Sequence, residues 1–359
     1  MGTTSLVVAD ELFSLATERT IQPDEFKSMR EVPTFFADDA FKSVVTLDGG
    51  RSIDTPYIFE RHSQPTSMTW GTQYRVPDTF NQPQMKSGSD GWMWIVQPMF
   101  FGGIDRNYYD SKDKQIDKVK VITADVWNHL HESFEEAALR GTTSSGSYTA
   151  NLAAQQWAGL NPINGTDFAS GLIEEDASGG NTIHGISRSS YPVTTYKRFH
   201  PVASDVGNSA STNLLDRLVT MELNFKQRGG NMQRAEVYGH PDGILQLNKV
   251  LRPFSQYTSM ESAKDTYGVP RLLGKEVKPV TLPINGANTG TDPWSFLGVT
   301  WGKGGLAHVR HKNWNMRVTK WEKIPGTAEC QMAMVLIQAQ NILFQPGSNF
   351  LIHSANQYS

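Results

Sequence analysis

The feature that most limits how this chain can fold is the helical periodicity of residues 112–140, KDKQIDKVKVITADVWNHLHESFEEAALR. Apolar side chains recur there at every third or fourth position, which places them on one face of an α-helix. These positions are Ile116, Val119, Ile122, Val126, Leu130, Phe134 and Ala137. Asp113 is a suitable N-cap and Gly141 a suitable C-terminal stop. We predict a helix of about 38 Å, with Leu130 and Phe134 on its buried face.

Size and composition bound the remaining possibilities. The chain has 359 residues, more than the roughly 250–300 that one hydrophobic core usually serves, so one multi-lobed unit or two domains are expected. The net charge of −3 argues against a dedicated nucleic-acid-binding protein, which normally carries a basic excess. With Cys330 as the single cysteine, neither a disulfide within the chain nor a two-cysteine metal site is possible.

Residues 66–97 have the pattern of an extended ribbon. Apolar residues alternate with polar ones in two runs, a period of two that is typical of strands. The alternating residues are Met68, Trp70, Tyr74 and Val76 in the first run, and Trp92, Trp94 and Val96 in the second. Between the runs lies PDTFNQPQMKSGSDG, rich in turn-forming residues. We predict a long hairpin whose aromatic face packs on a neighbouring surface, or else folds back on its own domain.

The other segments indicate a mixed protein. Residues 1–45 have the spacing of a helical arm with little core of its own. Residues 213–227 predict a second helix, followed by a strand, a turn and a third helix up to about residue 251. From about residue 268 the chain is rich in short strands, and QPGSN at 345–349 predicts a turn between the last two.

No catalytic constellation can be assembled from the sequence. WGKGGLAH at 301–308 lacks the spacing and the Ser or Thr of a phosphate-binding loop. His308 and His311 are three residues apart in a strand-like segment, where hydrogen-bonded histidines are a simpler account than a metal site. The acidic run at 174–176 has no third group beside it. We therefore expect no catalytic residue, cofactor or metal, and favour an assembly protein over an enzyme.

The segment GLIEEDASGGNTIHGISRSSYP at 171–192 resembles a pattern common in tailed-phage major capsid proteins. The likeness rests on Gly171-Leu172-Ile173, on Gly179-Gly180, and on the run from Gly185 to Pro192, with Ser187 where Asp is frequent. Tyr196-Lys197-Arg198 stands near the aromatic–Arg pair of that family. The order of elements agrees with that family: an arm, an extended loop, a long spine helix, and two terminal strands. The resemblance covers roughly residues 60–355.

The resemblance implies an α+β chain with the Hong Kong 97-type capsid fold. Its expected divisions are an N-terminal arm at 1–59, an extended β-hairpin loop at 60–105, a peripheral domain with the spine helix at 106–145, an axial domain at 146–310, and C-terminal strands at 311–359 that return to the peripheral domain. The glycine-rich segment is expected to be a surface loop against a neighbouring subunit. In that loop Gly179, Gly180 and Gly185 could take positive φ. Arg188 would either contact a carboxylate or remain a solvated cation.

The function implied by the resemblance is that of a major capsid protein. Many copies would form hexamers and pentamers of an icosahedral shell around the packaged double-stranded DNA of a tailed virus. Separate scaffold, portal and decoration proteins are the expected partners, assembly would take place in the host cytoplasm, and no membrane is involved. The expected assembly contacts are Trp70, Tyr74, Trp92, Trp94 and Arg188. An encapsulin-like compartment with the same fold, and an enzyme using the carboxylates at 174–176, are the alternatives.

Overall fold

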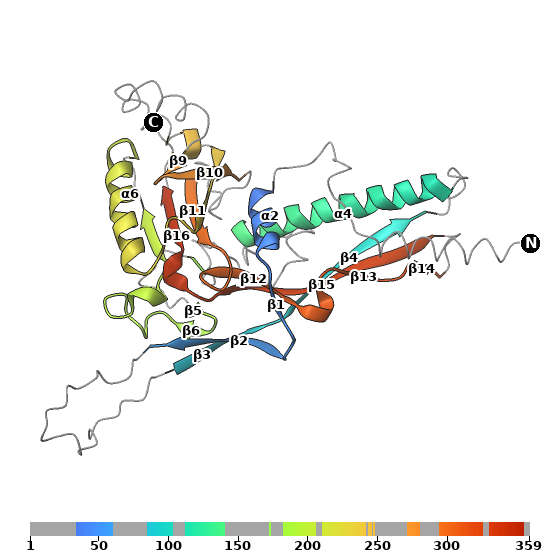
Figure 1. Ribbon diagram of the computed structural model, residues 1–359, viewed down its shortest axis with the longest axis horizontal. Coiled ribbons are helices and arrows are strands. Elements are labelled where there is room, and N and C mark those ends of the chain that lie inside the picture. The colour runs from blue at the N-terminus through green and yellow to red at the C-terminus, as the bar shows by residue number, and fades with distance from the viewer. Residues whose placement is uncertain are drawn as a thin grey trace, which may run out of the picture.

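The computed structural model describes residues 34–59, 85–102, 112–140, 172–173, 182–205, 210–241, 243–245, 247, 271–280, 294–325 and 330–354. In Figure 1 the described elements form two parts, with a long helix and long strands on one side and a compact sheet with its helix on the other. A two-stranded hairpin projects from the underside of the molecule. All statements below concern the described residues.

The elongated part is a sheet, here called the strip, built on the 13-residue strand β15 (Gln331–Leu343). Along one edge of β15, residues 331–339 pair antiparallel with β4 (Met93–Phe101). The strip also contains β1 (Val45–Leu47), β12 (Leu306–His311), β13 (Arg317–Val318) and β14 (Glu322–Lys323). The short helical turn η3 (Lys312–Trp314) joins β12 to β13.

The predicted long helix is α4 (Lys112–Arg140), 29 residues that lie along the strip (Figure 1). Leu130 and Phe134 are buried, as the periodicity predicts. They share a core with Ile95 and Met99 of β4 and with Ala333, Val335 and Ile337 of β15. The helix forms where the sequence places it because its apolar stripe has a sheet of matching length to cover.

The compact part is a second six-stranded sheet, with strand order β7-β16-β11-β8-β10-β9. Its strands are β7 (Val202–Asp205), β8 (Ala235–Gly239), β9 (Arg271–Leu272), β10 (Lys275–Pro279), β11 (Trp294–Thr300) and β16 (Phe350–Ser354). Helix α6 (Ala210–Gln227) covers one side through Phe225, which stacks edge-on against Phe350 at 5.3 Å. The predicted second helix, the strand after it and the strand-rich C-terminal region are thus confirmed, and the QPGSN turn is the short helical turn η4 (Pro346–Ser348).

The hairpin differs from the one predicted. Its strands are β2 (Ser52–Ile58) and β3 (Met85–Gly91), which pair antiparallel from Ser52↔Gly91 to Ile58↔Met85. The prediction that the run containing Trp92, Trp94 and Val96 forms one hairpin strand is wrong, because β4 pairs with β15 over its whole length. Alternation identifies a strand but says nothing about its partner, which here lies 230 to 246 residues away in the sequence. The other predicted strand, with Trp70 and Tyr74, lies outside the described residues.

The end of the predicted arm belongs to the subunit's own core. Helix α2 (Phe35–Lys42) buries Phe36, Ala37 and Ala40 completely. The Phe36 ring lies 5.0 Å from that of Tyr238 and 5.1 Å from that of Trp301. The prediction that residues up to about 45 lack a core is therefore wrong for α2, where two alanines allow close approach to α4. Residues 1–33 lie outside the described part of the chain.

None of the described helices combines the length and apolar character needed to cross a membrane. Within the described ranges, no group of three or more His, Cys, Asp or Glu side chains could hold a metal ion.

Candidate assembly surface

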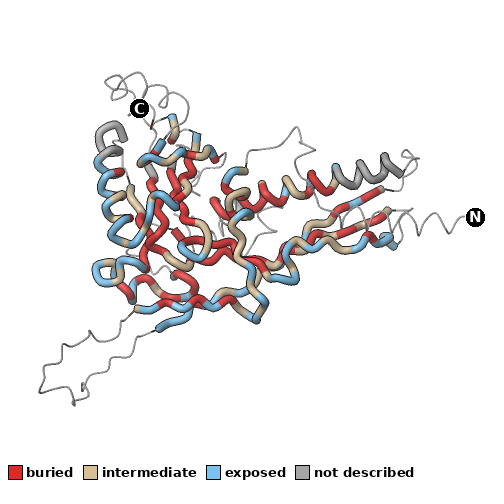
Figure 2. The backbone as a smooth tube through the Cα atoms, viewed as in Figure 1, coloured by how far each residue is buried: buried red, intermediate tan, exposed pale blue. Residues whose placement is uncertain are grey.

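Strand β4 is apolar on both faces. On the face toward α4, Ile95, Met99 and Phe101 are each 1% exposed. On the opposite face, Trp94 is 48%, Val96 41% and Phe100 58% exposed. Figure 2 shows exposed and buried residues alternating along this strand. A sheet face that meets water usually carries polar side chains, so the exposed side of β4 has the composition of a surface built to be covered.

The apolar character continues onto β15. Val96 is paired with Leu336, Pro98 with Met334 and Phe100 with Met332, and directly opposite residues lie on the same face of a sheet. The three β15 side chains are half-buried. We call the set comprising Trp94, Val96, Pro98, Phe100, Met332, Met334 and Leu336 the outer face. The sequence analysis identified only Trp94 and Val96 in this set. The run MWIVQPMFF at 93–101 is apolar at both odd and even positions, which indicates a strand that is apolar on both faces.

An aromatic pair lies at one end of the outer face. The Trp94 and Trp314 rings meet edge-to-face, with centroids 5.0 Å apart. The Arg317 guanidinium lies 5.4 Å from the centroid of the Trp314 ring, within cation–π range. Two large rings and a cation held at the surface are features that are enriched in protein–protein contacts.

The structure separates the predicted contact residues. Trp94 is exposed on the outer face, whereas Trp92 is half-buried and stacks against His311 with ring centroids 5.6 Å apart. Trp70 and Tyr74 lie outside the described residues. Arg188 is 3% exposed, and its Nη2 donates to the carbonyl oxygen of Leu172 at 2.8 Å. The alternative that Arg188 remains a solvated cation is wrong, because its guanidinium is buried and donates to the Leu172 carbonyl oxygen inside the subunit.

The segment around Arg188 forms a tight turn beneath the hairpin. Strands β5 (Thr182–Ile183) and β6 (Ile186–Ser187) pair around His184 and Gly185, which have φ of 52° and 79°. The positive φ predicted for Gly185 is confirmed, and Gly179 and Gly180 lie outside the described residues. Tyr191 is buried and stacks on Phe59, just after β2, with centroids 3.6 Å apart. The segment therefore packs on the subunit's own hairpin, not on a free surface.

A hollow of about 570 Å³ lies beside this stack, lined by both polar and aromatic groups. Its walls come from the end of β2, from residues 194–199, including the short helical turn η2 (Lys197–Phe199), and from residues 344–346 after β15. Lys197 and Arg198 make one wall basic. The hollow thus lies at the loop end of β2, beside residues 194–199 and 344–346.

Buried ionisable groups tie α2 to α4. Glu135 is 2% exposed, and its Oε2 accepts a hydrogen bond from the Ala37 N–H at 3.2 Å. Burial raises the pKa of Glu135 to about 7, although hydrogen bonds from the backbone of Ala37 and Phe36 oppose this shift. His131 Nδ1 lies 2.8 Å from Asp38 Oδ1. The start of α2 is therefore fastened to α4 by Glu135 and His131.

The other side of α2 is fastened to the compact sheet. Asp39 accepts a hydrogen bond from the Tyr238 hydroxyl at 2.7 Å and one from Lys278 Nζ at 2.5 Å. Lys278 also lies 3.1 Å from Glu236. Partial burial lowers the pKa of Lys278, but the hydrogen bonds to Asp39 and Glu236 outweigh it and raise that pKa overall. Helix α2 thus connects the long helix α4 and the compact sheet.

The two histidines considered for a metal site have ordinary hydrogen-bonding roles. His308 is fully buried in β12, with Nδ1 3.1 Å from Asn341 Oδ1. Burial, together with the nearby charge of Arg310, holds the pKa of His308 well below its usual value. His311 Nδ1 accepts from the Asn313 N–H at 3.1 Å. Both side chains serve the packing and turns of the strip.

Comparison with solved structures finds the same fold over nearly the whole chain. A chain of the Cyanophage A-1(L) capsid asymmetric unit is 16% identical, with a TM-score of 0.59, and the match covers 93% of this chain and 96% of that one. The capsid of Cyanophage P-SCSP1u is 11% identical, with a TM-score of 0.51 and coverage of 94% and 93%. The capsid of an empty GTA particle is 10% identical, with a TM-score of 0.52 and coverage of 95% and 97%. No family model and no curated protein matches the sequence.

These likenesses show the fold. The chain has the α+β, Hong Kong 97-type capsid fold that the sequence predicts.

Proposed function

We propose that the chain is a major capsid protein that self-assembles into the icosahedral head shell of a tailed virus. The observation that carries the proposal is the fold, shared over more than nine tenths of both chains with two cyanophage capsid chains. The outer face supports it independently, because a subunit that stays alone gains nothing from an apolar strand face in water. The work of such a protein is binding, and no catalytic role is proposed.

The proposed partners are further copies of the chain, arranged as hexamers and pentamers. Ring closure requires head-to-tail contacts between different surfaces of the same subunit. Trp94 is proposed as a contact residue on the outer face, and Trp70 and Tyr74 remain proposed contacts in the segment beyond β2. A role of Trp92 and Arg188 in assembly would be indirect, because both pack within their own subunit.

Other partners follow from the same proposal. A scaffold, a portal and decoration proteins would be separate chains, and double-stranded DNA would lie against the inner face of the shell. A net charge of −3 suits a wall that encloses DNA without gripping it. The proposed location is the virion capsid, after assembly in the host cytoplasm.

The test is to purify the full chain, with and without a co-expressed scaffold partner, and to follow its association by sedimentation velocity and electron microscopy. Capsomers or closed shells of megadalton size are the expected products. A protein that stays monomeric in both preparations and turns over a substrate would contradict the proposal. Particles from the native source should contain nuclease-protected DNA, whereas protein cargo in its place would favour the compartment alternative.

A further inference from the structure

The edge of β15 that faces the hairpin loses its strand partner before β15 ends. Pairing with β4 stops at Met93↔Ala339, and β15 continues to Leu343. Backbone groups on that edge are left to find other partners, because unpaired buried N–H and C=O groups are costly. The described structure supplies these partners from side chains and from the hairpin.

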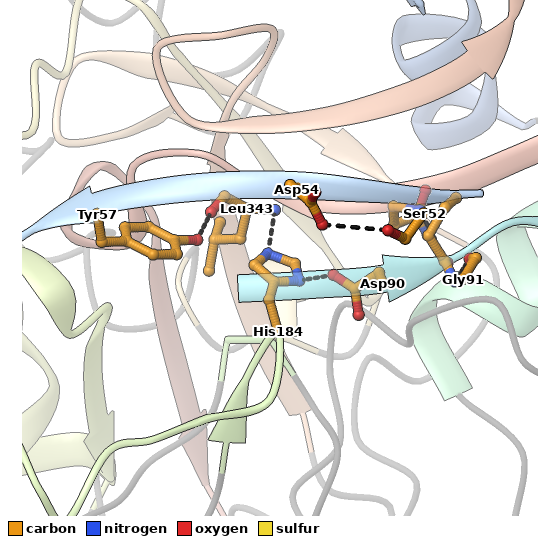
Figure 3. A network of polar contacts seen from close by, with 9 residues as sticks. Ser52, Asp54, Tyr57, Asp90, Gly91, His184 and Leu343 are labelled. Atoms are coloured by element: carbon orange, nitrogen blue, oxygen red, sulfur yellow. Dashed lines mark hydrogen bonds and ion pairs between the residues drawn. The ribbon is translucent and has the colours of Figure 1, made fainter. Parts of the chain in front are cut away.

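Three groups replace the missing strand. The Asn341 N–H donates to Gln340 Oε1 at 3.0 Å, and Gln340 Nε2 donates to the carbonyl oxygen of Gly91, at the end of β3, at 3.1 Å. The Leu343 N–H donates to His184 Nε2 at 2.9 Å. The Tyr57 hydroxyl donates to the Leu343 carbonyl oxygen at 2.5 Å. We call Tyr57, Asp90, His184 and Leu343 the clasp; Figure 3 shows these four groups converging between the hairpin strands and the turn below them.

This geometry fixes the protonation of His184. Because Nε2 accepts a hydrogen bond from a backbone N–H, it carries no proton, and the proton of the neutral ring must be on Nδ1. Nδ1 lies in direct contact with Oδ2 of Asp90 on β3. A carboxylate beside one ring nitrogen selects the tautomer that leaves the other nitrogen free to accept.

The surroundings hold the ring tightly. The His184 side chain is completely buried, and the Tyr57 ring stacks on it at 8° with centroids 6.4 Å apart. A Cβ at Gly88 would lie 2.6 Å from the Cβ of His184, and the Ser89 N–H donates to the His184 carbonyl oxygen at 3.1 Å. The hairpin therefore rests directly on His184, through both its backbone and its side chain.

We propose that His184 is the positioning residue of the hairpin: its neutral, Nδ1-protonated ring joins β3 to the end of β15 and fixes the direction in which the hairpin leaves the subunit. A second proton, on Nε2, would point at the Leu343 N–H and open that contact. The clasp is then a proton-dependent hinge beneath the hairpin. The inference deepens the proposed function, because the direction of the hairpin would decide which neighbour it reaches.

The titratable groups described around the ring are consistent with this role. Asp90 faces it from β3 and Tyr57 from β2, while β15 contributes backbone at Leu343. Burial, and then the nearby Asp90 charge, raises the pKa of the Tyr57 hydroxyl, which keeps it a neutral donor to Leu343.

The test measures amide hydrogen exchange of the peptides covering 340–344 and 85–91 in the purified full chain, from about pH 8 to about pH 4, after correction for the intrinsic exchange rate. In the wild-type protein we expect the Leu343 amide to exchange about tenfold faster once His184 is doubly protonated, the effect of losing one hydrogen bond. His184→Gln supplies an acceptor and a donor that do not titrate, and should keep protection at every pH. His184→Asn tolerates the left-handed backbone but is too short to reach Leu343, and should lose protection at every pH.

Asp90→Asn provides the second arm, because it keeps the size of the side chain and alters only what faces Nδ1. The Asn oxygen can accept from Nδ1–H as the carboxylate does, so the tautomer and the protection of the Leu343 amide at pH 8 should be kept. Circular dichroism and thermal melting check that each variant is folded. Equal pH profiles for wild type and His184→Gln would overturn the inference. These measurements need no assembled shell, so their failure is separable from failure of the proposed function.

Discussion

The two faces of β4 are both mainly apolar, but one is buried within the subunit and the other is exposed. Ile95, Met99 and Phe101 are buried against α4, whereas Trp94, Val96 and Phe100 are between two fifths and three fifths exposed. The inner partners come from within the subunit, because α4 is long enough to cover the strip. For the outer face, the described residues supply no equivalent cover. The two faces of β4 therefore pack at different stages. The inner face is buried when the subunit folds, and on our proposal the outer face is buried when subunits associate.

The largest expected effect on subunit stability is on the inner face. Phe101→Ala should lower the free energy of unfolding by about 3–5 kcal/mol, as removal of a buried phenylalanine usually does. Phe134→Ala, on the facing helix, should cost a similar amount. Urea denaturation of the unassembled subunit measures both. A loss of less than about 1 kcal/mol at either position would show that the inner face is not the core of the strip.

The next effect is a pH dependence of subunit stability that arises from Glu135 on α4. The pKa of Glu135 is raised from 4.5 to about 7, so the folded subunit holds a proton that the unfolded chain releases in this window. Stability should therefore be full below about pH 4.5 and fall as the pH rises through about 7, by at most roughly 3 kcal/mol. Glu135→Gln should be the more stable protein at pH 8 and nearly equal to wild type at pH 4.5. Parallel stability profiles for the two proteins would argue against a neutral Glu135.

A smaller effect on the subunit, with a large one on association, is expected on the outer face. Trp94→Ser combined with Phe100→Ser should lower the unfolding free energy by only about 1–2 kcal/mol, because both rings are already about half exposed and the main loss is the contact with Trp314. Sedimentation velocity should show that capsomers or shells no longer form. Phe100 and Phe101 are neighbours in sequence but lie on opposite faces of β4. The comparison is sharpest if changing Phe101 destabilises the subunit while changing Phe100 impairs only association. Normal assembly of the double variant would remove the outer face from the account.

The smallest effect is expected at a matched exposed site. Val219 and Leu223 lie four residues apart on α6 and are 58% and 57% exposed, but they form a short patch, and isolated exposed apolar residues are common. Changing both to Ser should leave stability within about 0.5 kcal/mol and leave association intact. If this variant loses assembly as completely as the outer-face variant, apolar surface in general, and not the strip, drives association.

Local patterns predicted what local physics decides. The extent of α4 follows from its long apolar stripe, and the extent of α6 was predicted to within three residues. The positive φ at position 185 follows from the residue type, because glycine adopts this conformation readily. Strand partners did not follow, because β4 pairs with residues 331–339 and β2 with residues 85–91, and alternation is the same whichever strand lies opposite.

The candidate site was predictable only in part, for the same reason. Trp94 could be predicted as a contact because it is an aromatic residue in an alternating strand pattern. Phe100 could not, because its exposure depends on which face of β4 is covered by α4. The burial of Arg188 depends on the Leu172 carbonyl, and the clasp joins His184 to Leu343, 159 residues later in the chain. No local signal marks such long-range hydrogen bonds.

The central claim is that the outer face is completed by another copy of the chain. Electron cryomicroscopy of the purified assembly, at a resolution that shows side chains, tests it most directly. The account predicts that Trp94 and Phe100 lose most of their exposed surface beneath residues of a neighbouring subunit, while Ile95 and Phe101 keep the contacts they have in the single subunit. A shell in which Trp94 and Phe100 still face solvent would contradict it.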